Sequence, residues 1–196
     1  AAGGTIQHLD PAGVITQTAP AGRARQMNAG ANRASGDILL FLHADTELPA
    51  DALGRIETTL EVHDAGAFDI RFIGTRPVYK YISAWASWRS RITKIPYGDQ
   101  CIFIKKQLFT ALGGYAEMPL MEDIELMQRL KKKKKSVGFI REPVKSSTRR
   151  WEAEGVFFTM NRNLVLSTLF YCGVPAEKLA VHYKNGKRVY RKNAYE

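Results

Sequence analysis

The stretch 37–46 constrains the fold of this chain more than any other. An unbroken apolar run, residues 38–42, follows the turn pair Ser35 and Gly36 and ends abruptly at His43 and Asp45. A continuous apolar run bounded by turn residues is typical of a strand buried on both faces. In open α/β sheets, ligands bind beyond the carboxyl ends of such strands. The sequence therefore predicts a site at this strand end, with a cation and a phosphate as the favoured ligands.

Helical and strand patterns alternate along the rest of the chain. Apolar and polar residues alternate over 67–73, which predicts a strand with Phe68, Ile70 and Phe72 on one face. Further strands are expected over 100–104 and 136–140, and helices over 23–34, 49–62, 78–93, 106–113, 121–133 and 154–172, with a short helix from Pro175. Strands that alternate with helices predict an α/β fold with a mostly parallel sheet. Without a repeat or a clear linker, residues 1–196 are interpreted as one domain.

The composition restricts the classes of partner. The net charge of +10 suits nucleic acid, an anionic membrane surface or a phosphorylated small molecule. The lysine run 131–135 is explained most simply as the solvated end of a helix, where cations complement the helix dipole. No zinc-finger spacing or RNA-binding aromatic signature accompanies the charge, so no nucleic-acid partner is expected. Cys101 and Cys172 fit a reduced, cytoplasmic protein, and no apolar run is long enough to span a bilayer.

Two further acidic positions are candidates for chemistry. Asp99 lies in a glycine-containing loop, and Glu122 with Asp123 opens a predicted helix. An acidic residue at a helix start most often serves as a cap or a dipole partner. Here the preceding residues 119–121 are apolar, and they could bury a carboxylate and raise its pKa. A carboxylate tuned in this way is what a general base needs.

Five segments, taken in chain order, resemble one protein family. They are residues 22–30 (GRARQMNAG), 41–46 (FLHADT), 97–100 (YGDQ), 121–123 (MED) and 149–151 (RRW). Together they resemble the family 2 glycosyltransferases of GT-A fold, and most closely the bacterial radical-SAM/selenodomain-associated transferases. The resemblance implies a Rossmann-like sheet that binds a nucleotide sugar and usually Mn²⁺ or Mg²⁺.

The resemblance also implies roles for individual residues. Asp45 matches the metal-binding end of the family's Asp-x-Asp motif, and His43 stands where the first acidic residue of that motif usually lies. Asp123 corresponds to the catalytic base of an acidic pair that it forms with Glu122. On the donor side the resemblance places Arg23, Arg25, Asn28, His43, Asp45, Arg150 and Trp151, and on the acceptor side Asp99 and Gln100.

The resemblance implies a metal-dependent, inverting transfer of a sugar to a sugar or lipid-linked acceptor. Ser147 stands where processive relatives carry glutamine, so polymer synthesis is not expected. The rival interpretation is a non-catalytic module of the same fold that binds a glycan or an anionic surface. We also expect the family's first strand–helix–strand to be missing or disordered here, because no apolar opening strand precedes residue 22.

Aromatic and basic residues in the helices 78–93 and 154–172 suggest peripheral contact with the inner face of a membrane. The alternative is that these faces pack in the core or in a homo-oligomer.

Overall fold

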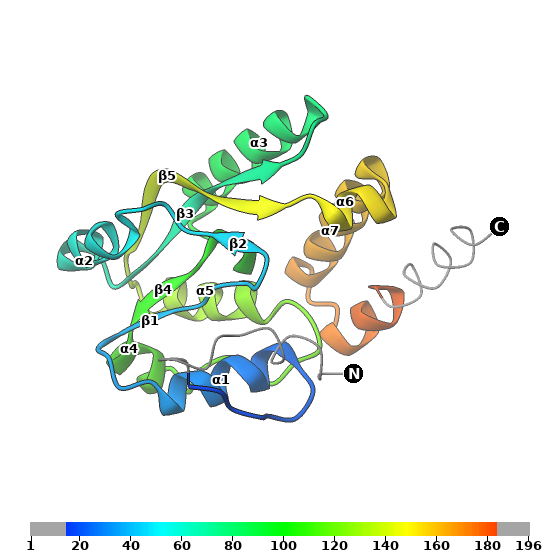
Figure 1. The fold of residues 1–196 in the computed structure, drawn as a ribbon. Helices are drawn as coiled ribbons and strands as arrows, with labels where there is room; N and C mark the ends of the chain where they lie inside the picture. Colours follow the sequence, from blue (N-terminus) through cyan, green and yellow to red (C-terminus); the bar gives the residue numbers. More distant parts are fainter. Residues whose placement is uncertain (1–14, 184–196) are drawn as a thin grey trace.

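A five-stranded sheet forms the centre of the computed structural model, which describes residues 15–183 (Figure 1). The strand order is β1-β4-β3-β5-β2. The strands are β1 (Ile38–Leu40), β2 (Thr46–Glu47), β3 (Ala65–Ile73), β4 (Phe103–Lys105) and β5 (Val137–Ser147). The predicted α/β class and the GT-A-like arrangement of a sheet flanked by helices are confirmed.

The helices follow the predicted pattern closely. They are α1 (Arg23–Arg33), α2 (Ala52–Val62), α3 (Val78–Thr93), α4 (Lys106–Ala111), α5 (Glu122–Lys132), α6 (Arg149–Glu154) and α7 (Val156–Tyr171), with a 3-10 turn η2 (Gly98–Gln100). A further helical stretch begins at residue 176. The helix predicted over 154–172 is wrong at its start, because Gly155 adopts φ 85 and separates α6 from α7. Residues 1–14 and 184–196 lie outside the described part of the chain, so the expectations about the opening strand–helix–strand and about one domain over 1–196 stay predictions.

The sheet is mixed in strand direction. In the described residues, the longest ladder, between β3 and β5, is parallel, whereas β1 with β4, β3 with β4 and β2 with β5 are antiparallel. Helix α3 covers the edge of β3 after Gly66. The hydroxyl oxygens of Ser87 and Ser83 in α3 accept the backbone N–H groups of Ile70 and Phe72 at 3.0 and 2.9 Å. Strand β4 accordingly pairs with the first residues of β3 alone, in the antiparallel sense.

Strand β1 is less buried than its apolar sequence predicts. Leu39 is buried, whereas Leu42, just beyond the strand, is 47% exposed. In the part of the chain that the structure describes, β1 is one of the two edge strands of the sheet. The prediction of a strand here is confirmed: on one face Leu39 is buried in one core group, and on the other face Ile38 and Leu40 are partly buried against a second.

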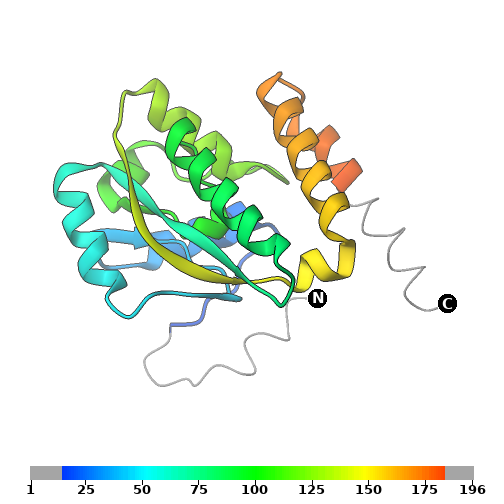
Figure 2. The same ribbon diagram turned by 90° about the horizontal axis from the view of Figure 1, so that it is seen from above.

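Two groups of buried apolar side chains form the core. The first packs α1, α4 and α5 against β1 and β4, with Phe109, Ile124 and Leu130 among its members. The second packs α2 and α3 against β3 and β5, and includes Ile56, Phe68 and Ile82. Helix α7 adds Val156 to the second group but leaves much of its apolar surface outside both. Helix α7 lies to one side of the sheet and its covering helices (Figure 2).

Candidate active site

A cavity of about 210 Å³ opens where the turn after β1 meets η2, α5 and α6. The structure brings a large part of the predicted site to this one cavity: its walls include Arg23, His43, Asp45, Asp99, Asp123, Arg150 and Trp151. These residues come from segments separated by more than a hundred positions of sequence. We call this space the charged cavity.

Asp123 is held rigidly at the wall of the charged cavity. Its Oδ2 accepts the backbone N–H of Gly98 at 2.6 Å, and its Oδ1 accepts the N–H of Ile124 at 2.8 Å. Two backbone donors fix the plane of the carboxylate and leave further lone pairs for a ligand. A Cβ at Gly98 would lie 2.6 Å from Nη2 of Arg23 and 3.3 Å from Oδ2 of Asp123, so a larger residue would displace the end of the Arg23 side chain.

Glu122 lies beneath the cavity rather than in its wall. Its side chain is 2% exposed, and its Oε1 lies 3.1 Å from Nε of Arg23. Burial raises the pKa of the Glu122 carboxyl, and the nearby Arg23 cation opposes that rise. The structure therefore separates the predicted acidic pair: Asp123 faces the cavity, whereas Glu122 orients Arg23.

Arg23 also determines the state of His43. Nη2 of Arg23 lies 3.0 Å from Nε2 of His43, and a guanidinium can only donate, so Nε2 accepts and the ring proton lies on Nδ1. Burial, reinforced by the Arg23 charge and opposed by Asp45 and Asp123, holds the pKa of His43 below its usual value. His43 is consequently a neutral group.

Asp45 lies in the turn between β1 and β2 and remains accessible. Its side chain is 43% exposed, and Oδ2 lies 3.7 Å from Nη2 of Arg149. Among the described residues, no three His, Cys, Asp or Glu side chains gather as a ready-made metal site. Asp45 nevertheless fits Mg²⁺ or Mn²⁺ bound together with a diphosphate, because Mg²⁺ is commonly held by one or two carboxylates, substrate phosphates and water.

A buried ion-pair cluster supports Arg150. Oε2 of Glu154 lies 2.6 Å from Nη1 of Arg162 in α7 and 3.5 Å from Nε of Arg150. Both arginines also lie over the ring of Tyr183, at 4.7 and 4.8 Å from its centre. Burial lowers the pKa of Arg150, and the Glu154 carboxylate opposes this. The cluster links α6 to α7 and fixes a cation beside the charged cavity.

Asp99 is the acid with the most perturbed ionisation in the site. Burial, reinforced by the negative charge of Asp123, raises the pKa of Asp99 to about 6, although Arg89 and Arg23 oppose the shift. Two carboxylates near one another disfavour simultaneous ionisation. Asp99 can therefore exchange a proton near neutral pH, which an ordinary surface aspartate cannot do.

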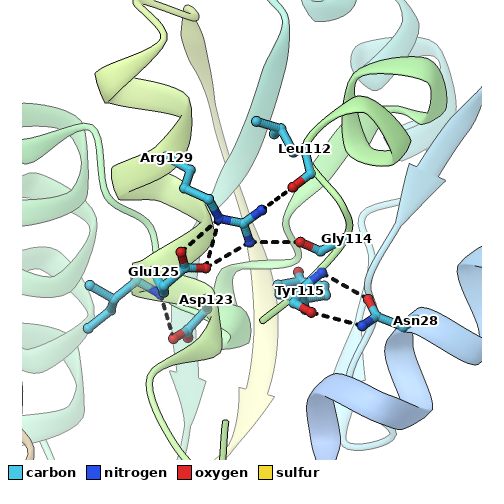
Figure 3. A network of polar contacts seen from close by, with 8 residues as sticks. Asn28, Leu112, Gly114, Tyr115, Asp123, Glu125 and Arg129 are labelled. Atoms are coloured by element: carbon cyan, nitrogen blue, oxygen red, sulfur yellow. Dashed lines mark hydrogen bonds and ion pairs between the residues drawn. The ribbon is translucent and has the colours of Figure 1, made fainter. Parts of the chain in front are cut away.

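Besides Glu122, three further predicted site residues do not line the charged cavity. The exposed Arg25 pairs with Glu117 at 3.0 Å. Asn28 exchanges two 2.9 Å hydrogen bonds with the backbone of Tyr115, as Figure 3 shows. The Gln100 amide donates to the Phe68 carbonyl at 3.0 Å and accepts from Ser90. Asn28 and Gln100 hold together the segments that carry the site.

The sequence interpretation missed some residues of the cavity wall. Asn163 and Ser167 of α7 line it, as does Tyr183. The available signal was a polar pair spaced four residues apart in a largely apolar helix, which places both on one helix face. Tyr183 offered no comparable signal, because its position depends on how the chain returns after α7.

Similarity to known proteins agrees with this geometry. The family model described as "Glycosyl transferase family 2" matches residues 5–116 of the 196-residue chain. The match covers more than half of the chain, and the chain therefore belongs to glycosyl transferase family 2. No curated protein matches the chain. The match ends before Asp123 and Arg150, so their arrival at the same cavity is an independent observation from the structure. Within the described residues, no helix is both long and apolar enough to cross a membrane.

Proposed function

We propose that this protein transfers a sugar from a nucleoside-diphosphate donor to an acceptor hydroxyl, by one displacement that inverts the anomeric carbon. The observation that supports it most is the meeting of Asp45, Arg150 and Asp123 at one cavity. Cations suit a diphosphate, and a fixed carboxylate suits an acceptor proton. The order of the five sequence segments further favours the radical-SAM/selenodomain-associated branch.

In the proposed reaction Asp123 accepts the proton of the acceptor hydroxyl while the hydroxyl oxygen forms a bond to the anomeric carbon of the donor sugar. The bond from that carbon to the diphosphate oxygen breaks, and its electron pair leaves with the diphosphate. Arg150, and Arg23 held by Glu122, stabilise the charge that develops there. A divalent cation bound by Asp45 would supply further neutralisation of the diphosphate.

Release of nucleoside diphosphate tests the proposal. The chain is incubated with UDP- and GDP-sugars, with Mn²⁺ or Mg²⁺, and with a long-chain alcohol or water as acceptor. We expect metal-dependent release of one nucleoside diphosphate together with a glycosylated product of inverted configuration. Binding of a glycan without any release of nucleotide would instead favour the non-catalytic module.

A further inference from the structure

A second and larger cavity, of about 690 Å³, lies between α3 and α7. These two helices lie beside one another on the same side of the molecule, coloured green and orange in Figure 2. The cavity shares Phe72, Tyr97, Asp99 and Trp151 with the charged cavity, so the two spaces adjoin at Asp99. We call it the α3–α7 cavity.

The wall of the α3–α7 cavity is largely hydrocarbon and aromatic. Helix α3 contributes Val78, Ile82 and Trp85, and α7 contributes Met160, Leu164 and Tyr171. A volume of several hundred cubic ångströms with an apolar lining is typical of a small-molecule site. The lining chemistry indicates what kind of molecule fits.

Several polar groups in this wall are already engaged by the protein. The hydroxyls of Thr93 and Ser167 donate to backbone carbonyls within their own helices, at 2.9 and 3.0 Å. The Arg89 guanidinium is stacked 3.6 Å from the centre of the Tyr97 ring and donates to the Ile95 carbonyl. Burial of a sugar's hydroxyl groups against the remaining, largely apolar wall would be unfavourable.

We propose that the α3–α7 cavity binds a hydrocarbon portion of the acceptor, with the acceptor hydroxyl directed past the shared residue Asp99 towards Asp123 in the charged cavity. This inference names the acceptor class of the proposed transferase and rests on that function for the role of the hydroxyl. The hydrocarbon belongs either to a free long-chain alcohol or to a membrane lipid. Trp85 is 48% exposed and Tyr81 76% exposed, so the cavity opens to the outside and a chain longer than the cavity can extend beyond it.

Quenching of tryptophan fluorescence by bromododecanol tests the proposal without any donor present. Trp85 and Trp151 line the cavity, so a bromine atom inside it quenches their emission. The matched variants are Leu164→Glu and Val165→Glu. The two residues are adjacent in α7 and are 51% and 54% exposed, but only Leu164 lines the cavity. A carboxylate in the wall should weaken saturable quenching at least tenfold, because its burial against an apolar chain is unfavourable.

We expect saturable quenching in the native protein and in Val165→Glu, and loss of it in Leu164→Glu, with matched circular dichroism. No saturable quenching, or equal affinities in both variants, would overturn the proposal. Displacement of bromododecanol by a disaccharide such as maltose would also overturn it, because the cavity would then bind a sugar.

A second arm separates the two sources of hydrocarbon. Phosphatidylcholine vesicles that contain bromododecanol are mixed with the protein and floated on a density gradient. Flotation of the native protein that is lost in Leu164→Glu identifies a membrane lipid. Binding of the soluble alcohol without flotation identifies a free alcohol. Either result supports a hydrocarbon site. Failure of nucleotide release with intact alcohol binding would contradict the proposed transferase alone.

Discussion

The two adjoining cavities are built in opposite ways. The charged cavity is assembled from short pieces of several elements, and ion pairs such as Arg23 with Glu122 and Arg162 with Glu154 hold them in place. The α3–α7 cavity is formed mainly by two long helices, whose Thr93 and Ser167 hydroxyls are bonded within their own helices. The two cavities suit different ligands: oriented charge suits the proposed diphosphate, and apolar area suits the proposed hydrocarbon. Asp99 belongs to both.

The largest expected effect falls on the charged side. Asp123→Asn should lower the rate of nucleotide release by about 10²- to 10⁴-fold, the range for removal of a general base. Donor affinity should change little, since the amide keeps the shape of the side chain. The initial rate of nucleoside-diphosphate release measures this effect, with circular dichroism as the control for folding.

Glu122→Gln is the comparison for this variant, and it should cost less because Glu122 lies below the cavity wall and acts through Arg23. A larger loss in Glu122→Gln than in Asp123→Asn would exchange the two roles and contradict the assignment of the base.

A smaller effect tests the support of Arg150. Glu154→Gln should weaken nucleotide affinity about tenfold, because loss of one oriented, charge-assisted contact to the diphosphate is worth ~1.4 kcal/mol. Bromododecanol affinity should stay the same. Calorimetry measures the affinity for the nucleotide, and fluorescence quenching measures the affinity for bromododecanol. Glu152→Gln is the control, since this exposed residue of α6 does not line either cavity. Equal loss of both ligands would indicate general unfolding of the α6–α7 junction.

The smallest effect concerns Asp99 and is a dependence on pH. Its pKa is about 6 in the folded protein and near 3.8 in the unfolded chain, so between these values the folded state binds more protons. Native stability therefore falls as pH rises from about 4 to about 6. Asp99→Asn cannot titrate, and its free energy of unfolding relative to the native protein should rise over this window by an amount on the order of 2 kcal/mol.

Urea unfolding of both proteins across the window measures the difference. A constant difference between the two proteins would show that the pKa of Asp99 is not perturbed.

Patterns local in sequence predicted the elements well. The alternation of Phe68, Ile70 and Phe72 marked β3, and the acidic start and basic end of α5 marked that helix. Strand direction could not be predicted in this way. Pairing between strands involves contacts of distant segments that no periodicity links, and the serine hydroxyls of α3 at the edge of β3 are a contact of the same kind.

The candidate site was predictable in residue type more than in role. His43 and Asp45 were found at the end of an apolar run, Asp99 in a glycine-containing loop and Asp123 at a helix start. The structure brings all four to one cavity. Asn28 and Gln100 have equally suitable side chains, yet both are bonded to backbone groups. The α3–α7 cavity escaped prediction because aromatic helix faces are equally consistent with a core, a dimer interface or a membrane surface.

Nucleotide binding tests the central claim most directly. Isothermal titration of UDP and of GDP, each with and without Mn²⁺, is carried out on the native protein, on Asp45→Asn and on the control Glu47→Gln. Glu47 is an exposed acid of β2, only two positions away, and it does not line the charged cavity.

We expect Mn²⁺ to strengthen the binding of one of the two nucleotides. Asp45→Asn should abolish this strengthening without unfolding the protein, whereas Glu47→Gln should leave it intact. An amide lacks the charge that a hard cation requires. Metal-dependent affinity that is unchanged in Asp45→Asn, with matched circular dichroism, would contradict the assignment of the charged cavity as the donor site.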